Sequence, residues 1–162
     1  MNDSISAGLL MYKIDRDELK VFLVHPGGPF FKNKDDGYWS IPKGLVEKDE
    51  DILDSAIREF KEETGIEPDG KFDSLGWVKQ KSGKTIHAWS FEYFGDNHIK
   101  ILSNEFELEW PPNSGQKQFI PEVDEGRFFS MAEARLKIRG AQAEFLDVLQ
   151  KNLKKLNFKK FV

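Results

Sequence analysis

The amino-acid sequence predicts an α/β protein of the α+β type, in which a mixed β-sheet packs against helices. Segments of strand-like composition and segments of helical periodicity follow one another irregularly, without the strict strand–helix repeat of an all-parallel sheet. The 162 residues are enough for one domain with a sizeable hydrophobic core, and no internal repeat or low-complexity linker divides them. We therefore expect a single domain over residues 1–162.

The composition excludes several classes of site. The chain has no Cys, which excludes disulfides, thiol catalysis and cysteine metal sites, and its three His residues are scattered. A formal net charge of −4 provides no overall basic field, so nucleic acid is not expected as a partner. We find no apolar run of membrane-spanning length and no secretory signal, and therefore expect a cytoplasmic protein.

The N-terminal part of the chain is predicted to form strands around a long loop. Ser4–Lys13 is rich in Ile, Leu, Met and Tyr, and a turn with the sequence DRDE separates it from a second strand at Leu19–Val24. The following segment, His25–Gly37, is too rich in Pro and Gly for regular structure, and long loops of this kind are often functional. Trp39–Ile41 is expected to be a short strand.

The remaining elements start with a helix at Asp51–Thr64, which Gly65 ends in the usual position after a helix. A second long loop is expected at Trp110–Gly126, where Pro and Gly recur. The other expected elements are strands at Phe72–Gln80, Lys84–Phe94 and Glu105–Glu109, a short strand or strand end at Phe128 and Phe129, and helices at Met131–Lys137 and Ala141–Leu156, which Gly140 separates.

The helix at Asp51–Thr64 carries an unfavourable group of carboxylates. Glu59, Glu62 and Glu63 are three or four residues apart and share one face, at the end where the helix dipole is negative. Each like-charge pair costs about 0.2–0.5 kcal/mol, and Arg58 is a single cation against three anions. The group is either a solvated acidic face or a site for a hard divalent cation such as Mg²⁺ or Mn²⁺.

The same stretch resembles the Nudix box, a signature with many fixed positions. The sequence before it, Trp39–Gly44, resembles the usual lead-in of that family. The resemblance implies an α/β/α sandwich with a mixed sheet between helices, and the loop resembles a bacterial subgroup of predicted nucleoside-triphosphate or diadenosine polyphosphate pyrophosphohydrolases. The matching residues are Gly44, Glu50, Arg58, Glu59, Phe60, Glu62, Glu63, Gly65 and Ile66.

The resemblance implies a Mg²⁺-dependent (or Mn²⁺-dependent) enzyme that hydrolyses a nucleoside diphosphate linked to another moiety. Carried over to this chain, Glu59 and Glu63 are the principal metal ligands and Glu62 is a further ligand. The Gly44 carbonyl is a backbone ligand. Arg58 orients the carboxylates and pairs with Glu50. Such chemistry depends on charge neutralisation and in-line positioning more than on covalent help from the protein.

A general base is still required, and many family members take it from a loop outside the box. The segment with the sequence PEVDEG offers Glu122 as the first candidate and Glu125 as the second. Glu59 is a third candidate. The alternative for each loop acid is that it only makes the loop soluble.

Candidate substrate-binding residues surround the box. Lys43 is placed to meet a phosphate oxygen, whereas Lys32 and Lys34 are either contacts to a polyphosphate tail or ordinary surface lysines. Three aromatic residues are candidates for stacking a nucleobase: Phe30, Phe31 and Tyr38. Trp39 is expected in the core, and His25 is expected to have a structural role at a strand end.

The substrate is expected to be a nucleoside triphosphate or a dinucleoside polyphosphate. Gln80–Ile86 has neither the Pro of ADP-ribose enzymes nor the Tyr of diadenosine polyphosphate hydrolases. Two alternatives are a catalytically silent Nudix-like module that binds a nucleotide and an enzyme acting on the 5′ end of RNA. The C-terminal run KNLKKLNFKKFV is either a solvated helix face or a contact for RNA or an acidic partner. A homodimer is possible, since dimers are common among such domains.

Overall fold

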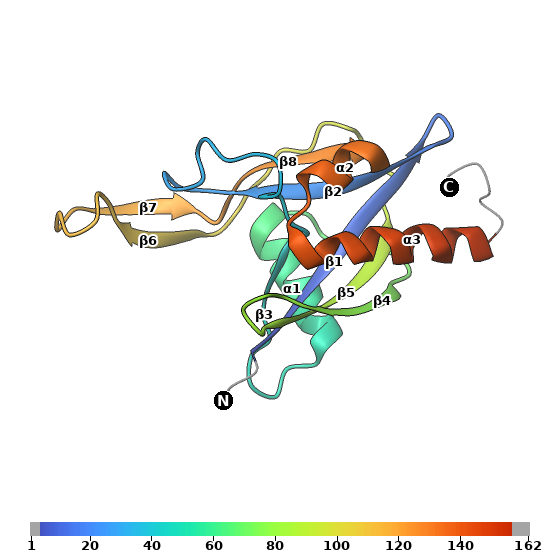
Figure 1. The fold of residues 1–162 in the computed structure, drawn as a ribbon, viewed down its shortest axis with the longest axis horizontal. Coiled ribbons are helices and arrows are strands. Elements are labelled where there is room, and N and C mark those ends of the chain that lie inside the picture. The colour runs from blue at the N-terminus through green and yellow to red at the C-terminus, as the bar shows by residue number, and fades with distance from the viewer. Residues whose placement is uncertain (1–3, 157–162) are drawn as a thin grey trace.

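A six-stranded mixed sheet forms the centre of the protein in the computed structural model, which describes residues 4–156 (Figure 1). Five strands follow the order β4-β5-β1-β2-β8, and β3 pairs with β1. The pairing of β1 with β5 is parallel and all others are antiparallel. The strands are β1 (Ile5–Asp15), β2 (Glu18–Pro26), β3 (Lys43–Leu45), β4 (Asp73–Lys79), β5 (Thr85–Glu92) and β8 (Val123–Ser130).

Strand β1 is buried on both faces because it lies in the middle of the sheet. Leu9 and Met11 belong to one hydrophobic core, whereas Leu10 and Tyr12 belong to the other. Alternate residues of a strand point to opposite faces, so a strand covered on both sides is hydrophobic throughout. This explains the continuous run of apolar residues in the N-terminal segment.

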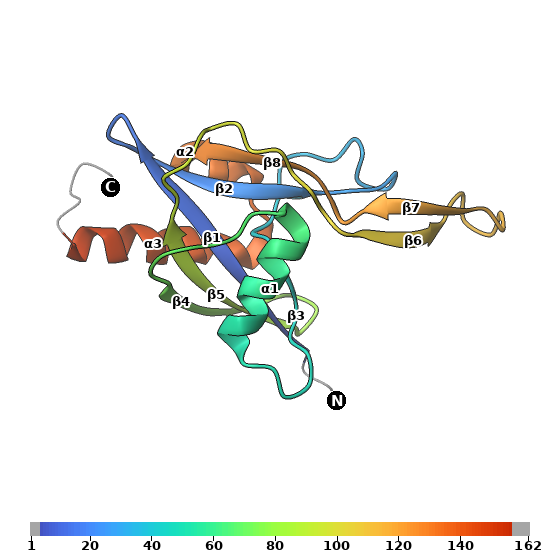
Figure 2. The same ribbon diagram turned by 180° about the vertical axis from the view of Figure 1, so that it is seen from behind.

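Helices cover both faces of the sheet. Helix α1 (Ile52–Thr64) buries Ala56 and Phe60 against one face, as Figure 2 shows from behind. The other face is covered by α2 (Met131–Lys137), the 3₁₀ helix η1 (Gly140–Gln142) and α3 (Ala143–Lys155). The predicted fold class, a mixed sheet between helices, is confirmed. None of the helices within residues 4–156 combines the length and the apolar character needed to cross a membrane.

Both ends of helix α1 are capped, and Gly65 ends the helix as the sequence predicts. The Asp51 side chain accepts a hydrogen bond from the amide of Asp54 (3.1 Å), and Gly65 adopts φ 75°. A later segment then donates two amides to the last carbonyls of the helix: Leu102 to Thr64 (3.0 Å) and Asn104 to Glu62 (2.8 Å). Because these carbonyls have no partner within the helix, the contacts fix the segment against the end of α1.

Two predictions about local structure are wrong. Trp39–Ile41 forms only isolated bridges, from Ser40 to Val24 and from Trp39 to Ile138, while the strand in this region is β3. The second loop contains strand β7 (Lys117–Pro121), which pairs with β6 (Glu105–Glu109). The same loop also ends earlier than predicted, because strand β8 starts at Val123 and pairs along β2, and Phe128 and Phe129 lie at the end of this strand as expected. Partners distant in the sequence determine these strands. Residues 157–162 of the C-terminal lysine-rich run lie outside the described residues.

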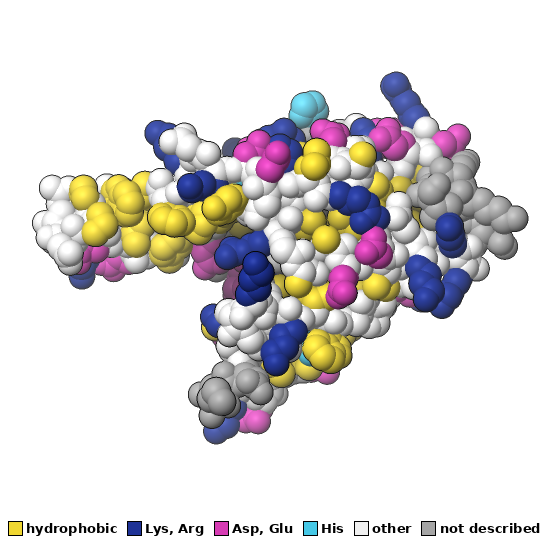
Figure 3. Space-filling view, viewed as in Figure 1, with side chains coloured by type: hydrophobic (Ala, Val, Ile, Leu, Met, Phe, Trp, Pro, Cys, Tyr) yellow, Lys and Arg dark blue, Asp and Glu magenta, His cyan; other side chains and the backbone are white. Residues whose placement is uncertain are grey.

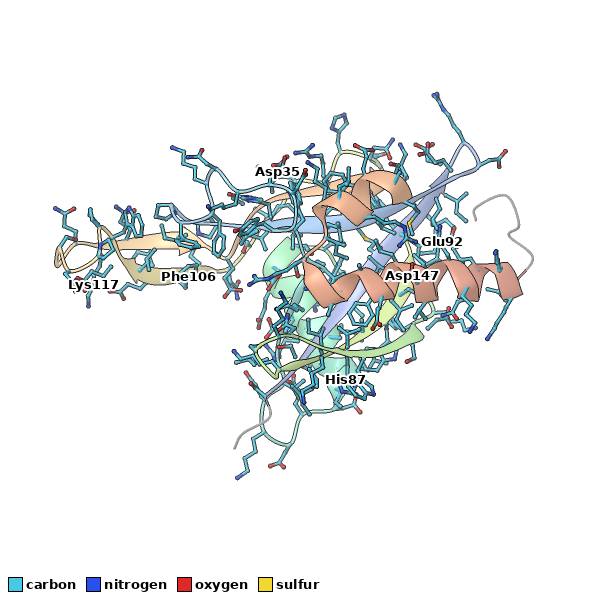
Figure 4. All side chains as sticks on the ribbon, in the orientation of Figure 1. Asp35, His87, Glu92, Phe106, Lys117 and Asp147 are labelled. Carbon is cyan, nitrogen blue, oxygen red and sulfur yellow. The ribbon has the colours of Figure 1, made fainter. Side chains whose placement is uncertain are left out.

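Strands β6 and β7 form an arm that projects from the body (Figures 1 and 2). Figure 4 shows Phe106 and Lys117 on this arm, well away from the helices. Phe106 pairs with Ile120 in the register, and the glutamates of β6 alternate with its apolar residues. The arm begins and ends next to the C-terminal end of α1, so its return strand brings residue 122 to that helix end.

Candidate active site

Helix α1 and strand β3 are in direct contact at Glu59 and Gly44. The Glu59 side chain lies so close to the Gly44 backbone that a Cβ on residue 44 would be 2.0 Å from the carboxylate and would displace it. Glu59 is buried, with 9% of its surface exposed. The glycine at the start of the Nudix-like pattern therefore leaves the space that the Glu59 carboxylate occupies in this arrangement.

Arg58 connects the carboxylates on the solvent side of α1. Its guanidinium donates to Glu50 (2.8 Å), Glu59 (2.8 Å) and Glu62 (3.2 Å), and also to the carbonyl of Leu45 (3.2 Å). These bonds raise the pKa of Arg58 and lower the pKa of Glu50 to about 2. Arg58 thus holds Glu59 and Glu62 in fixed positions, as an orienting residue would.

The negative charge around α1 remains only partly compensated. Burial raises the pKa of Glu63 to about 8, with Glu122 and Glu59 adding to the effect and Lys43 opposing it. The pKa of Glu59 is raised by burial and by Glu62 and Glu122, although Arg58 opposes it. Burial and Glu62 also raise the pKa of Glu122. We call Glu59, Glu62, Glu63 and Glu122 the acidic cluster.

The acidic cluster has the donor chemistry of a site for Mg²⁺ or Mn²⁺. All of its donors are hard carboxylate oxygens, and Glu59 and Glu122 disfavour the ionisation of Glu63, as expected where a cation is needed. Within residues 4–156, no group of three or more Asp, Glu or His side chains is arranged so that together they could hold a metal ion. Mg²⁺ retains several waters and binds through one or two carboxylates together with substrate phosphates, so this donor set fits the ion.

Glu122 reaches the acidic cluster through main-chain contacts on both sides. Its amide donates to the carbonyl of Asn104 (2.8 Å), and its carbonyl accepts from Gly27 (3.0 Å). Glu125 has a different position: it lies in β8 and accepts a hydrogen bond from Arg127 (2.9 Å). Of the two loop acids considered as a base, only Glu122 lies beside α1.

A small cavity of about 130 Å³ opens beside the acidic cluster. Its lining includes Tyr38, Lys43, Glu63, Glu122 and Arg139. The pKa of Lys43 is lowered by burial, an effect that the nearby Glu63 opposes. Arg139 follows α2 and has no motif around it, so sequence reasoning did not identify it. The cavity thus brings two cations and an aromatic ring together with two of the carboxylates.

Lys32 lies in a different cavity, of about 560 Å³, which we call the loop cavity. Lys34 also lines it, together with the acidic residues Asp35, Asp124 and Glu125. The structure therefore does not bring Lys32 and Lys34 to the acidic cluster, and it surrounds them with carboxylates that disfavour an anion.

The aromatic residues of this region divide as follows. Phe31 and Tyr38 are neighbours, with ring centroids 6.2 Å apart, and Phe30 is exposed beside Phe31. Trp39 is buried in the core, as expected. The buried His25 ring is held between the Asp124 carboxylate (2.9 Å) and the Lys34 carbonyl (2.6 Å), a structural position at the end of β2. Only Tyr38 among these residues lines the cavity beside the acidic cluster.

A family model, that of the NUDIX domain, matches residues 5–149. The chain belongs to the Nudix family. Rat bis(5′-nucleosyl)-tetraphosphatase [asymmetrical] is 39% identical over 80 residues, which are 45% of this chain and 54% of the rat protein. The chain therefore spans only about half the length of this curated relative.

Two solved structures share the Nudix fold over nearly the whole chain. The Caenorhabditis elegans Ap4A hydrolase in a binary complex has a TM-score of 0.68 at 18% identity, covering 93% of this chain and 98% of that one. The NUDIX domain of Shewanella oneidensis NrtR complexed with ADP ribose has a TM-score of 0.63 at 16% identity, with coverage of 94% and 90%. At these identities the likeness concerns the fold.

Proposed function

We propose that the protein is a Mg²⁺-dependent pyrophosphohydrolase that cleaves a phosphoanhydride bond in a nucleoside triphosphate or a dinucleoside polyphosphate. The observation that carries the proposal is the acidic cluster: Glu59 lies against Gly44, and Glu63 and Glu122, whose pKa values are raised, line a cavity together with Lys43 and Arg139. Membership of the Nudix family and the partial similarity to a tetraphosphatase support the same reaction class.

Glu59 and Glu63 are proposed as the principal ligands of the ion, with Glu62 and the Gly44 carbonyl as further ligands. When bound, Mg²⁺ would supply the positive charge that phosphoryl transfer requires. Arg58 holds the Glu59 and Glu62 carboxylates in place through its bonds to both. The proposed ligands thus come from one helix turn and the neighbouring strand.

Glu122 is proposed as the general base. Water attacks phosphorus, its oxygen forms the new P–O bond, and the Glu122 carboxylate accepts the proton that water releases. The phosphoanhydride P–O bond breaks and its electron pair leaves with the departing phosphate oxygen. A raised pKa suits this role, since a base is most effective when its pKa approaches the working pH.

Lys43 and Arg139 are proposed to bind phosphate oxygens, because both cations border the cavity that contains Glu63 and Glu122. Tyr38, with Phe31 beside it, is proposed to stack the nucleobase. The nucleoside would then lie towards the loop and the phosphates towards β3.

Product analysis tests the proposal. The protein is incubated with nucleoside triphosphates, dinucleoside polyphosphates and nucleotide sugars, with and without Mg²⁺, and the products are separated by chromatography. We expect turnover of a triphosphate or a dinucleoside polyphosphate that depends on Mg²⁺. A complete lack of turnover would instead favour a silent nucleotide-binding module, and release of pyrophosphate from triphosphorylated RNA alone would favour an enzyme of RNA 5′ ends.

A further inference from the structure

A larger cavity, of about 880 Å³, lies on the side of Lys43 and Gly44 that faces the β4–β5 turn. Five cationic side chains line this basic cavity: Lys43, Lys79, Lys81, Lys84 and Arg139. Among its lining residues in the described chain, none is acidic and none is aromatic. Figure 3 shows a group of Lys and Arg side chains over the β4–β5 turn, on the face that carries α3.

The cations of the basic cavity are available to a ligand. Within residues 4–156, Lys79, Lys81, Lys84 and Arg139 form no ion pair, whereas the body pairs other cations, such as Lys137 with Asp35 (2.8 Å). Five positive charges thus line one cavity whose described lining has no carboxylate. The cations therefore repel one another in the free protein, and an anion between them would relieve this repulsion.

The backbone holds these side chains at the mouth of the cavity. In the β4–β5 turn, the amide of Gln80 donates to the carbonyl of Lys84 (2.8 Å) and Gly83 adopts φ 91°. Arg139 is fixed by the bond from its amide to the carbonyl of Trp39 (2.8 Å). The β4–β5 turn and the segment at Arg139, which are far apart in the sequence, thus place cations at one cavity from backbone that hydrogen bonds hold in position.

The basic cavity borders the small cavity beside Glu63 and Glu122, because Lys43 and Arg139 line both. A chain of phosphates that starts at the acidic cluster reaches the basic cavity past these two side chains. Aromatic stacking is not available there, whereas charge-assisted hydrogen bonds from several cations are.

We propose that the basic cavity is a subsite for the phosphates of a long polyphosphate chain, beyond those held at the acidic cluster. The inference rests on the proposed function and makes it more specific: the substrate carries more phosphates than the acidic cluster alone accommodates. The nucleoside lies at the Tyr38 end and the distal phosphates lie among Lys81, Lys84 and Arg139. A dinucleoside tetraphosphate or longer homologue meets this requirement better than a nucleoside diphosphate linked to a neutral group.

The test uses inorganic tripolyphosphate as a probe, in EDTA, so that neither turnover nor a metal is needed. Isothermal titration calorimetry measures its Kd for the wild type and for Lys84→Gln, Arg139→Gln and the double variant. The matched control is Lys151→Gln, an exposed lysine on α3 outside the cavity that makes the same change in net charge. We expect about a tenfold weaker Kd for each single variant, a larger loss for the double variant, and less than a twofold change for the control.

Equal Kd values for all variants would overturn the subsite, and so would a short RNA oligonucleotide that binds the cavity more tightly than tripolyphosphate. A second measurement separates this result from the proposed function: hydrolysis of a dinucleoside tetraphosphate with Mg²⁺. There, Lys84→Gln should raise KM about tenfold while kcat persists. If the protein hydrolyses the substrate but all variants have the same Kd for tripolyphosphate, only the subsite is refuted. If the variants weaken tripolyphosphate binding but the protein shows no turnover, the subsite is supported and the enzymatic function is refuted.

Discussion

The acidic cluster and the basic cavity lie on either side of Lys43 and Gly44, and their charges are arranged in opposite ways. On the α1 side, carboxylates crowd together and share one guanidinium, that of Arg58. On the β4–β5 side, the cavity lining of the described chain has cations without carboxylates. Within residues 4–156 no ion pair joins the two regions.

The difference shows that neither region is electrostatically balanced on its own. The carboxylates require a cation and the lysines require an anion, which a Mg²⁺ complex of a polyphosphate supplies together. If the two charged groups paired directly, both would be neutralised and the site would be lost. Lys43 lies between them and is influenced by both: burial lowers its pKa most, Glu63 opposes this effect, and Arg139 and Lys84 add to it.

Replacing Glu63 by Gln should have the largest effect on the acidic side. One charge that stabilises the transition state of phosphoryl transfer is worth roughly 10³-fold or more, so we expect Glu63→Gln to lower kcat by about that factor. The amide has nearly the volume of the acid and removes the charge. Steady-state hydrolysis with saturating Mg²⁺ measures the loss, and retention of the wild-type rate would show that Glu63 is not a ligand.

The same variant should affect stability in the opposite direction. The folded-state pKa of Glu63 is about 8, above its ordinary value of 4.5, so in EDTA this group costs stability increasingly as the pH rises from about 4.5 to 8. Glu63→Gln removes that cost. We expect its Tm in EDTA to fall less than the wild-type Tm over this interval, which scanning calorimetry measures. Parallel Tm curves would contradict the burial of an uncompensated charge.

The sequence predicts the acidic side of this comparison better than the basic side. Glu59, Glu62 and Glu63 share one helix face, and Gly65 ends that helix as expected, because helical periodicity and capping are local properties. Gly44 is recognisable only through its spacing from them. The structure adds the physical reason, which is the Glu59 carboxylate against its backbone.

The basic cavity could not be predicted because tertiary structure assembles it. Lys84 and Arg139 are 55 positions apart in the sequence; Lys84 lies in the stretch Gln80–Ile86, which lacks the expected Pro or Tyr, and Arg139 stands in no recognisable pattern. Lys32, in a conspicuous loop, was predicted instead, yet the fold places it among Asp35, Asp124 and Glu125. Glu122 and Glu125 look equivalent in the sequence, and only the start of β8 at Val123 separates their positions.

Replacing Glu122 by Gln should have the next largest effect on the rate. A general base contributes about 10²–10⁴-fold, so we expect kcat to fall by about 100-fold or more. The variant should also lose the acidic limb of the pH–rate profile that titration of Glu122 produces. Glu125→Gln is the matched control, since that carboxylate pairs with Arg127 away from α1. A wild-type profile in Glu122→Gln would assign the base to Glu59 or Glu125.

Arg58→Lys should have an intermediate effect. A lysine keeps the positive charge but cannot reach Glu50, Glu59 and Glu62 together, as the planar guanidinium does. Residues that orient metal ligands are typically worth about 10–100-fold, and we expect about a tenfold loss of kcat with a weaker apparent affinity for Mg²⁺. Titration of activity with Mg²⁺ separates the loss of kcat from the loss of Mg²⁺ affinity. Full activity of the variant at low Mg²⁺ would show that Arg58 does not orient the metal ligands.

Tyr38→Leu should have the smallest effect and should distinguish the two ends of the proposed substrate. Stacking on an aromatic ring is worth about 1–3 kcal/mol per base, so the lower limit predicts roughly a fivefold increase in KM for a nucleotide with kcat unchanged. The Kd of inorganic tripolyphosphate should stay the same, because this probe has no base and occupies the far side of Lys43. Lys84→Gln should differ from this variant, because it should weaken the binding of tripolyphosphate as well as that of the nucleotide. If Tyr38→Leu weakened both ligands equally, the base and the distal phosphates would not lie on opposite sides of Lys43 and Gly44.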